Sequence, residues 1–191
     1  MRKSLFILLS AIFFIQCEKP EELVEIGEIT ERTPEEIAAI KDYAPAFAFN
    51  SIEGNRISLA GLKGKYVFID IWATWCRPCL QQLPAMKELE EKYRGQNIEF
   101  VSISVDNDQD KVKWQKMVRE KQMSGTQLFA GRETSFHQDY EISTIPKFLI
   151  IGKEGEIISE NPPRPMDYTT GQVNQQLVSI LDNLLKEEKA L

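Results

Sequence analysis

The sequence is short of the residues from which metal and nucleotide sites are made. Its 191 residues include one histidine, His137, and three cysteines, of which only Cys76 and Cys79 lie close together. A structural zinc site takes four such ligands, so these residues alone do not supply one. The chain also has no glycine-rich phosphate-binding motif and no internal repeat, which argues against the common nucleotide-binding and repeat architectures.

Long hydrophobic runs are scarce as well. The main one, Leu5–Ile15, is too short to span a membrane as a helix, and Arg2 and Lys3 precede it. Cys17 follows at once, and the whole segment resembles a bacterial lipoprotein signal, although Gln16 replaces the usual small residue. We therefore expect residues 1–16 to be a lipoprotein signal peptide and Cys17 to carry the lipid. An uncleaved membrane anchor, or ordinary secretion with a spare thiol, are the alternatives.

Positive charge is in deficit. The chain has 23 Lys and Arg against 29 Asp and Glu, and loss of the signal segment would change the net charge from −6 to −8. This balance argues against nucleic acid as a partner and against an electrostatic membrane patch. Residues 17–43 are acidic and predict a tether with a short helix near Thr33–Lys41. The domain would then lie in the bacterial cell envelope, on the periplasmic side. In some bacteria an Asp directly after the lipidated cysteine retains a lipoprotein at the inner membrane; this chain has Glu18 there, which favours the outer membrane.

A Cys-x-x-Cys motif is the feature that carries chemistry. Cys76 and Cys79 follow the apolar run Tyr66–Trp72 and begin a segment with the pattern of a helix. A helix N-terminus favours a thiolate at Cys76, which predicts the nucleophile there. Cys79 lies one turn further along, so it should be more buried and should resolve a mixed disulfide.

The two residues between the cysteines modify this reading. Pro78 suits the first turn of a helix, where its missing N–H costs little. Arg77 should lower the thiol pKa of Cys76 and make the disulfide more oxidising. Half of a zinc site and a plain structural disulfide remain as alternative interpretations of the motif.

Two residues elsewhere point to the same chemistry. Asp70 stands inside the apolar run, where burial would raise its pKa and make it a general base for Cys79. A carboxylate at a frayed strand end is the alternative. Pro146 precedes another apolar run, and most X–Pro bonds are trans.

These segments together resemble the thioredoxin superfamily. The resemblance rests on Asp70–Cys79, Pro84 and Ile145-Pro146, while Ala44–Phe47 and Gly61–Lys65 are similar to its TlpA/ResA-like branch of envelope oxidoreductases. It implies that Cys76 and Cys79 are the redox pair and that a cis Pro146 faces them. The substrate-binding residues would be Trp75, Arg77, Pro78, Ile145 and Pro146. The proton relay would be Asp70.

The resemblance and the residue pattern predict one α/β domain over 44–191. It would be a thioredoxin fold, a central mixed β-sheet flanked by helices, with an N-terminal β-hairpin and a TlpA-like insertion. The expected strands are Phe47–Asn50, Arg56–Leu59, Tyr66–Trp72, Ile98–Val105, Thr126–Phe129, Phe148–Gly152 and Glu156–Glu160. The expected helices are Cys76–Tyr93, Asp108–Lys121, Glu133–Tyr140 and Gln172–Leu185. Val112, Trp114 and Val118 should face inward from the second helix.

The predicted function is thiol–disulfide exchange with protein substrates, in the reducing direction, with electrons from a membrane reductase and no cofactor beyond the disulfide itself. Because Arg77 would make the disulfide more oxidising, a disulfide oxidase or isomerase is the alternative function. A copper-handling protein on the same fold would need a histidine beside the thiolates. His137 falls in a predicted helix, where we expect it to face solvent, and we predict no metal site.

Overall fold

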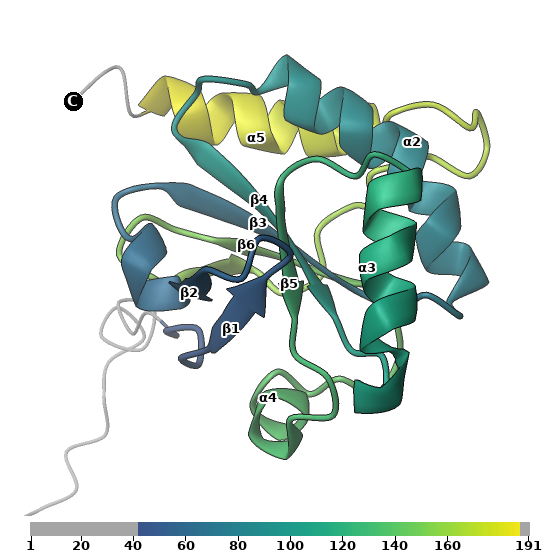
Figure 1. The fold of residues 1–191 in the computed structure, drawn as a ribbon. Helices are drawn as coiled ribbons and strands as arrows, with labels where there is room; N and C mark the ends of the chain where they lie inside the picture. The colour runs from purple at the N-terminus through teal and green to yellow at the C-terminus, as the bar shows by residue number, and fades with distance from the viewer. Residues whose placement is uncertain (1–41, 188–191) are drawn as a thin grey trace, which may run out of the picture. The chain divides into compact units, whose positions relative to one another are not determined.

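A computed structural model describes residues 42–187, which form a mixed sheet with helices packed against it (Figure 1). The seven strands are arranged in the order β2-β1-β5-β4-β3-β6-β7. Their bounds are β1 (Ala48–Ser51), β2 (Arg56–Ser58), β3 (Tyr66–Trp72), β4 (Ile98–Ser104), β5 (Thr126–Phe129), β6 (Lys147–Ile151) and β7 (Ile157–Ser159). The helices are η1 (Leu59–Leu62), α2 (Arg77–Lys92), η2 (Asp108–Asp110), α3 (Lys111–Glu120), α4 (Thr134–Asp139) and α5 (Gln175–Glu187).

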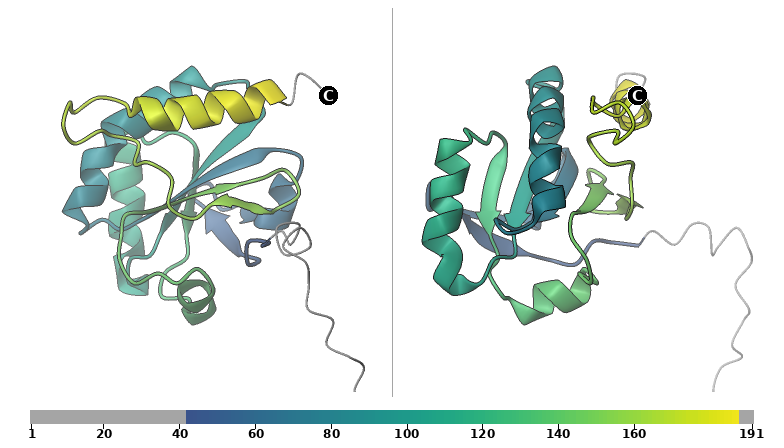
Figure 2. Two further views of the ribbon diagram at one scale, coloured as in Figure 1. Left: turned by 180° about the vertical axis from the view of Figure 1, so that it is seen from behind. Right: turned by 90° about the vertical axis from the view of Figure 1, so that its right-hand side faces the viewer.

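The three central strands run parallel, and antiparallel strands flank them on both sides. β4 pairs with β3 and with β5 in parallel, while β6 is antiparallel to β3. Both crossovers, β3-α2-β4 and β4-α3-β5, step across the sheet in one direction, so right-handed connections put α2 and α3 on the same face. Figure 2 shows α2, α3 and α5 side by side along the sheet. The expected mixed α/β sheet is thereby confirmed.

Side chains that alternate along each strand build a core on either face of the sheet. Beneath α2 and α5, Phe68 and Phe100 pack with Leu89 and Leu181. On the opposite face, Phe136 of α4 makes an edge-on contact with Phe49 of β1. The helices therefore cover both faces, with α4 alone among the α-helices of residues 42–187 on the second one.

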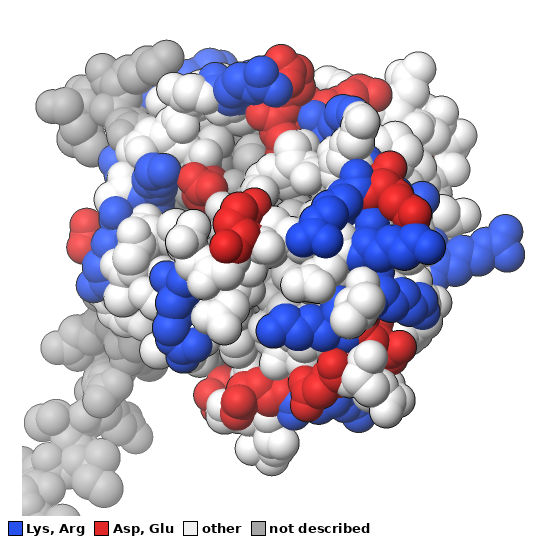
Figure 3. All heavy atoms as spheres, in the orientation of Figure 1, with Lys and Arg blue, Asp and Glu red and all other residues white. Residues whose placement is uncertain are grey.

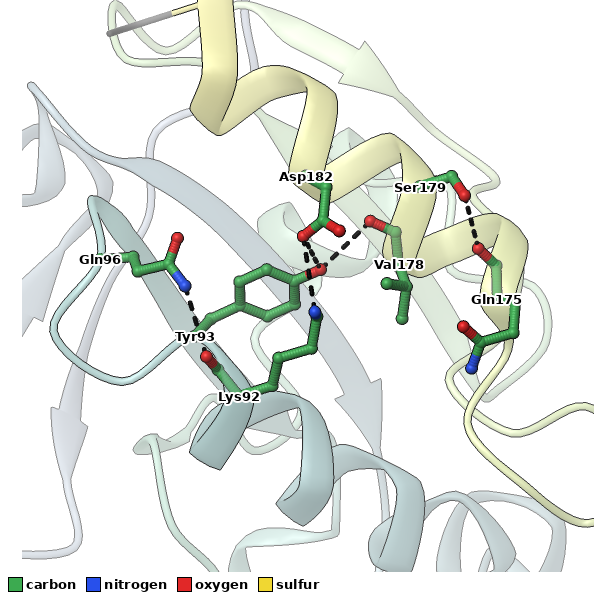
Figure 4. A network of polar contacts seen from close by, with 7 residues as sticks. All are labelled: Lys92, Tyr93, Gln96, Gln175, Val178, Ser179 and Asp182. Atoms are coloured by element: carbon green, nitrogen blue, oxygen red, sulfur yellow. Dashed lines mark hydrogen bonds and ion pairs between the residues drawn. The ribbon is translucent and has the colours of Figure 1, made fainter.

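The far end of α2 is tied to α5 by a polar contact (Figure 4). The Tyr93 hydroxyl lies 2.9 Å from Asp182 Oδ1 and 3.1 Å from the Val178 carbonyl oxygen. Lys92 adds an ion pair to Asp182 at 3.7 Å. These contacts fix the axis of α2, whose other end begins at the cysteine motif.

The surface charge is uneven even though the chain is acidic. Lys and Arg side chains gather over α3, whose sequence is KVKWQKMVRE (Figure 3). Trp114 and Val118 are buried as predicted. The prediction that Val112 faces inward from this helix is wrong, since Val112 is 74% exposed. The reason is that α3 starts at Lys111, after the short turn η2, so its first residues point away from the sheet.

The bounds of β3 and β5 agree with the sequence prediction to the residue, and those of the other five strands agree to within one residue. The α5 helix begins three residues later than expected, at Gln175. Within residues 42–187, no helix combines the length and the apolar character that crossing a membrane would require. The predicted signal peptide, Cys17 and most of the tether, with its short helix, lie outside the described residues.

Candidate active site

Cys76 and Cys79 form a disulfide at the start of α2, with sulfur atoms 2.00 Å apart and Cα atoms 5.3 Å apart. Cys76 is the N-cap residue of the helix, and the Cys79 backbone N–H donates a hydrogen bond to Cys76 Sγ at 3.2 Å. An N–H of the first helical turn that donates to this sulfur favours a thiolate on Cys76 after reduction. Both residues are 3% exposed, so the expected difference in burial is absent in the disulfide form.

The loop that presents Cys76 is held by a buried carboxylate, Asp106. The Thr74 backbone N–H and hydroxyl donate to Asp106 at 2.9 and 2.7 Å, and the Ser104 hydroxyl donates at 2.8 Å. Asp106 is fully buried, and these bonds replace the water that its charge would otherwise need. Sequence reasoning missed this residue. Its only signal was an acidic side chain directly after a buried parallel strand.

The Ile145–Pro146 peptide bond is cis and lies at the same edge of the sheet as the disulfide. Pro146 comes just before β6, and β6 pairs with β3 so that Lys147 faces Ile71. The end of β3 and the start of β6 are therefore adjacent, and the disulfide loop leaves from the end of β3. This confirms the cis bond that the resemblance implied.

Trp75 and Ile145 meet in one surface pocket of about 440 Å³. Trp75 is 59% exposed, which is unusual for so large an apolar side chain. Thr144 and the polar side chains of Arg132 and His137 also line the pocket. The lining thus combines apolar and polar side chains, as expected of a surface that contacts a peptide.

A second pocket, of about 260 Å³, adjoins the cis bond at Pro146. It shares Thr144 with the first and adds Pro146, Pro162 and Arg164. The Arg164 guanidinium lies 5.5 Å from the centre of the Tyr168 ring and donates to its hydroxyl at 3.1 Å. The loop that carries Arg164 therefore forms a wall of the site.

A buried glutamine of α2 holds that loop in place. Gln82 is 1% exposed; its Nε2 donates to the Tyr168 hydroxyl at 3.0 Å, and its Oε1 accepts from the Met166 N–H at 2.9 Å. Sequence reasoning missed Gln82, because its partners lie more than eighty residues further along the chain.

Asp70 is buried in the middle of β3, as the sequence predicted, and is 3% exposed. Burial raises its pKa from 3.8 to about 7, the negative charge of Glu90 adds to this rise, and a hydrogen bond from Ser102 opposes it. Asp70 Oδ1 accepts no hydrogen bond from any described residue. A carboxyl group with this pKa can take up and release a proton near neutral pH.

The remaining predicted residues are at the surface or outside the described chain. Arg77 and Pro78 are exposed in the first turn of α2. His137 lies in α4 and is half-buried in the pocket beside Trp75, so it does not simply face solvent. Within residues 42–187, no group of three or more His, Cys, Asp and Glu side chains is placed to hold a metal ion.

Comparison with known proteins gives one family match and a consistent set of relatives. Residues 40–159 match the model of the AhpC/TSA family. The chain is 31% identical to the thiol-disulfide oxidoreductase ResA of Bacillus thuringiensis subsp. konkukian over 128 residues, which is 67% of this chain and 72% of that protein. It is also 31% identical to ResA of Bacillus cereus over 117 residues, 61% of this chain and 66% of that one.

Solved structures agree with this result. The solution structure of a thiol-disulfide oxidoreductase from Bacteroides vulgatus superposes with a TM-score of 0.62 at 44% identity, covering 75% of this chain and 91% of that one. The thioredoxin domain of another thiol-disulfide oxidoreductase from the same species gives a TM-score of 0.64 at 21% identity, a likeness of fold alone.

Proposed function

Because this chain belongs to the AhpC/TSA family of the thioredoxin superfamily, with thiol–disulfide oxidoreductases among its relatives, we propose that it reduces disulfides of other proteins in the bacterial cell envelope. The chain is a thiol–disulfide oxidoreductase with a thioredoxin fold. The single observation that carries the assignment is the Cys76–Cys79 disulfide, with Cys76 at the N-cap of α2. We propose in addition the direction of electron transfer, the partner proteins and the role of each residue in the site.

The reaction begins from the reduced dithiol form. The Cys76 thiolate attacks one sulfur of a substrate disulfide, which forms a Cys76–substrate disulfide and releases the other substrate sulfur as a thiolate. The Cys79 thiol then loses its proton and attacks Cys76 Sγ. The intramolecular disulfide forms again, and the second substrate sulfur leaves as a thiolate. Two electrons pass to the substrate, and both of its thiolates take up protons from solvent.

Asp70 is proposed as the base in the second step. In its carboxylate form it accepts the proton of the Cys79 thiol and becomes a neutral carboxylic acid. Its burial and its pKa of about 7 support this role, since a base works best when its pKa lies near the working pH.

The substrate segment would lie across the cis bond. Trp75 and Ile145 supply apolar contact on one side of it and Pro146 lines the pocket on the other, while the exposed Arg77 and Pro78 flank Cys76. An extended substrate could pair with the backbone at Ile145. Ile145 precedes β6, so its backbone polar groups are not used in the pairing of β6 with β3.

The location and the electron supply are proposed from the sequence. Cys17 would carry a lipid that anchors the domain on the periplasmic side, with the outer membrane favoured, and a membrane reductase would return electrons to the disulfide. A disulfide cannot donate electrons until it is reduced, so a reducing role needs such a donor.

The reduction potential of the Cys76–Cys79 pair tests the direction. We expect a value near −270 mV, as for thioredoxin, when the protein is equilibrated with glutathione or dithiothreitol. A value near −120 mV would make the protein an oxidant of client thiols, with Arg77 as the natural cause. The Cys79→Ser variant should accumulate a mixed disulfide with a protein substrate and the Cys76→Ser variant should not. If neither variant traps substrate, the exchange mechanism is wrong.

A further inference from the structure

Glu90 of α2 lines two neighbouring cavities, a small one that reaches buried residues and a larger groove. The cavity, of about 30 Å³, is lined by Glu90 together with Ser102 of β4 and Gln127 of β5. The groove, of about 300 Å³, is lined by Glu90 together with Glu91, Arg94 and Gly125. Glu90 is therefore shared by the small cavity, which reaches the buried Ser102 and Gln127, and the larger groove.

The cavity has both apolar and polar lining, and its Ser102 connects it to Asp70. Ser102 lies beside Asp70 in the paired strands and hydrogen-bonds its carboxylate. Gln127 is 2% exposed; its Nε2 donates to the Ser124 carbonyl, while its Oε1 has no partner among the described residues. A cavity of this volume holds one water molecule, and the buried Oε1 needs a donor. A water there would join Ser102, Gln127 and Glu90.

The fold holds the Glu90 carboxylate in this position. The Ser124 hydroxyl donates to it, and a Cβ on Gly125 would come within 2.9 Å of Glu90 Oε1. Gly125 also has a φ of +68°, which few other residues adopt readily. In the turn before β5, Ser124 thus supplies a hydrogen-bond donor to the Glu90 carboxylate, and Gly125 leaves room for it.

We propose that Glu90 is the proton exit of the active site, which takes the proton from Asp70 through the Ser102 hydroxyl and a water in the cavity and releases it into the groove. This rests on the proposed role of Asp70 as the base for Cys79. After that step the Asp70 carboxylic acid gives its proton to Ser102, Ser102 passes one to the water, and the water passes one to the Glu90 carboxylate. Glu90 then loses the proton to solvent. Asp70 is a carboxylate again, and no electrons move.

The charges around this route are compatible with proton transfer. Burial raises the pKa of Glu90, while the Ser124 hydrogen bond and Lys87 oppose the rise. Lys87 and Lys121 line the cavity from α2 and from the end of α3. On the groove side the charged groups are Lys87 again, Glu91, Arg94 and Glu99. Asp70 is the titratable group on the inner side, from β3.

The test separates the two steps of exchange with an aromatic disulfide reagent whose halves absorb light when released. The first release reports attack by Cys76, and the second reports attack by Cys79. In the Glu90→Gln protein we expect the second release to slow about tenfold at a pH below the Asp70 pKa, where the proton must leave first, and to be unchanged well above it. The first release should be unchanged at both. Glu90→Asp keeps a carboxylate and should recover most of the rate.

A purely electrostatic role for Glu90 predicts the opposite sign. Removing its negative charge would lower the pKa of Asp70, leave more carboxylate at low pH and speed the second release. A faster or unchanged second release in Glu90→Gln would overturn the proposal. Glu91→Gln is the matched control, since it removes a more exposed charge from the next position and should change neither release. Loss of the first release in the unmodified protein would instead contradict the proposed function.

Discussion

Asp70 carries a cost in stability that ties its position to its proposed role. The folded protein holds the Asp70 proton up to about pH 7, while the unfolded chain gives it up near the ordinary value of 3.8. The folded state therefore binds more protons between these two values, and the free energy of unfolding falls as the pH rises through that window. Above about pH 7 the buried charge costs the folded state roughly 4 kcal/mol.

The Asp70→Asn variant should be more stable than the unmodified protein, by an amount that grows from about pH 4 to about pH 7 and is constant above it. Asparagine fills the same space and never ionises, so the gain has the pH dependence of the lost charge. Urea unfolding at several pH values measures it. The exposed Asp108→Asn change is a control that should show no such trend. A gain independent of pH would mean that Asp70 titrates normally.

The buried Asp106 should contribute more to the free energy of unfolding than the exposed Asp108 does. Asp106→Asn puts an amide nitrogen where at least one donor now points, so bonds from Thr74 or Ser104 are lost in a buried place. We expect a loss of about 3 kcal/mol in the free energy of unfolding. The loop before Cys76 loosens as well, so the first step of exchange should slow.

Urea unfolding of Asp106→Asn beside Asp108→Asn checks this prediction. Asp108 lies two positions further on and is exposed, so its change should alter stability by no more than about 0.5 kcal/mol. Equal effects in the two variants would show that the Thr74 contacts contribute little.

At the scale of elements, α2 organises the site from both of its ends and from its middle. Its N-terminus presents Cys76, its C-terminus is fixed to α5 through Tyr93, and Gln82 between them holds the loop that carries Arg164. The cysteine motif and one wall of the substrate surface are thus attached to the same helix. A shift of α2 would move both together.

Gln82→Ala should release that wall while leaving the helix formed. The Met166 N–H would lose its acceptor, and the Tyr168 hydroxyl would lose one of its two donors and keep Arg164. Backbone amides of the loop should therefore exchange hydrogen faster, Met166 above all. The stability cost should be about 1–3 kcal/mol. Mass spectrometry of hydrogen exchange measures the effect. Gln81→Ala, at an exposed position of the same helix, should leave the loop protected. Unchanged exchange at Met166 in Gln82→Ala would show that other contacts hold the loop.

At the scale of the whole molecule, the sequence predicts what depends on local pattern and misses what depends on distant partners. The apolar run of β3 gave its bounds to the residue, because a strand buried on both faces needs few polar positions. Val112 was placed wrongly because the turn η2 changes where the helix begins. Asp106 and Gln82 were not found, since each acts on residues far along the chain. Glu90 looked like one acid among several on a helix.

The last prediction concerns the folded domain as one thermodynamic unit. If the Cys76–Cys79 pair has a lower reduction potential in the folded protein than in the unfolded chain, then folding stabilises the disulfide relative to the two thiols. By the thermodynamic cycle, the oxidised protein must then be the more stable form, by about 1.4 kcal/mol for each 30 mV of difference. A reductase of the proposed kind should therefore unfold at higher urea concentration when oxidised than when reduced.

Urea unfolding of both forms, monitored by tryptophan fluorescence, measures this difference without any substrate. The Cys76→Ser protein, which has no disulfide in either condition, should unfold at the same urea concentration with and without reductant. A reduced form more stable than the oxidised one would mean that the site favours the Cys76 thiolate over the disulfide. The folded protein would then have a more oxidising disulfide than the unfolded chain, as Arg77 beside the nucleophile would favour. The proposed direction of electron flow would be reversed.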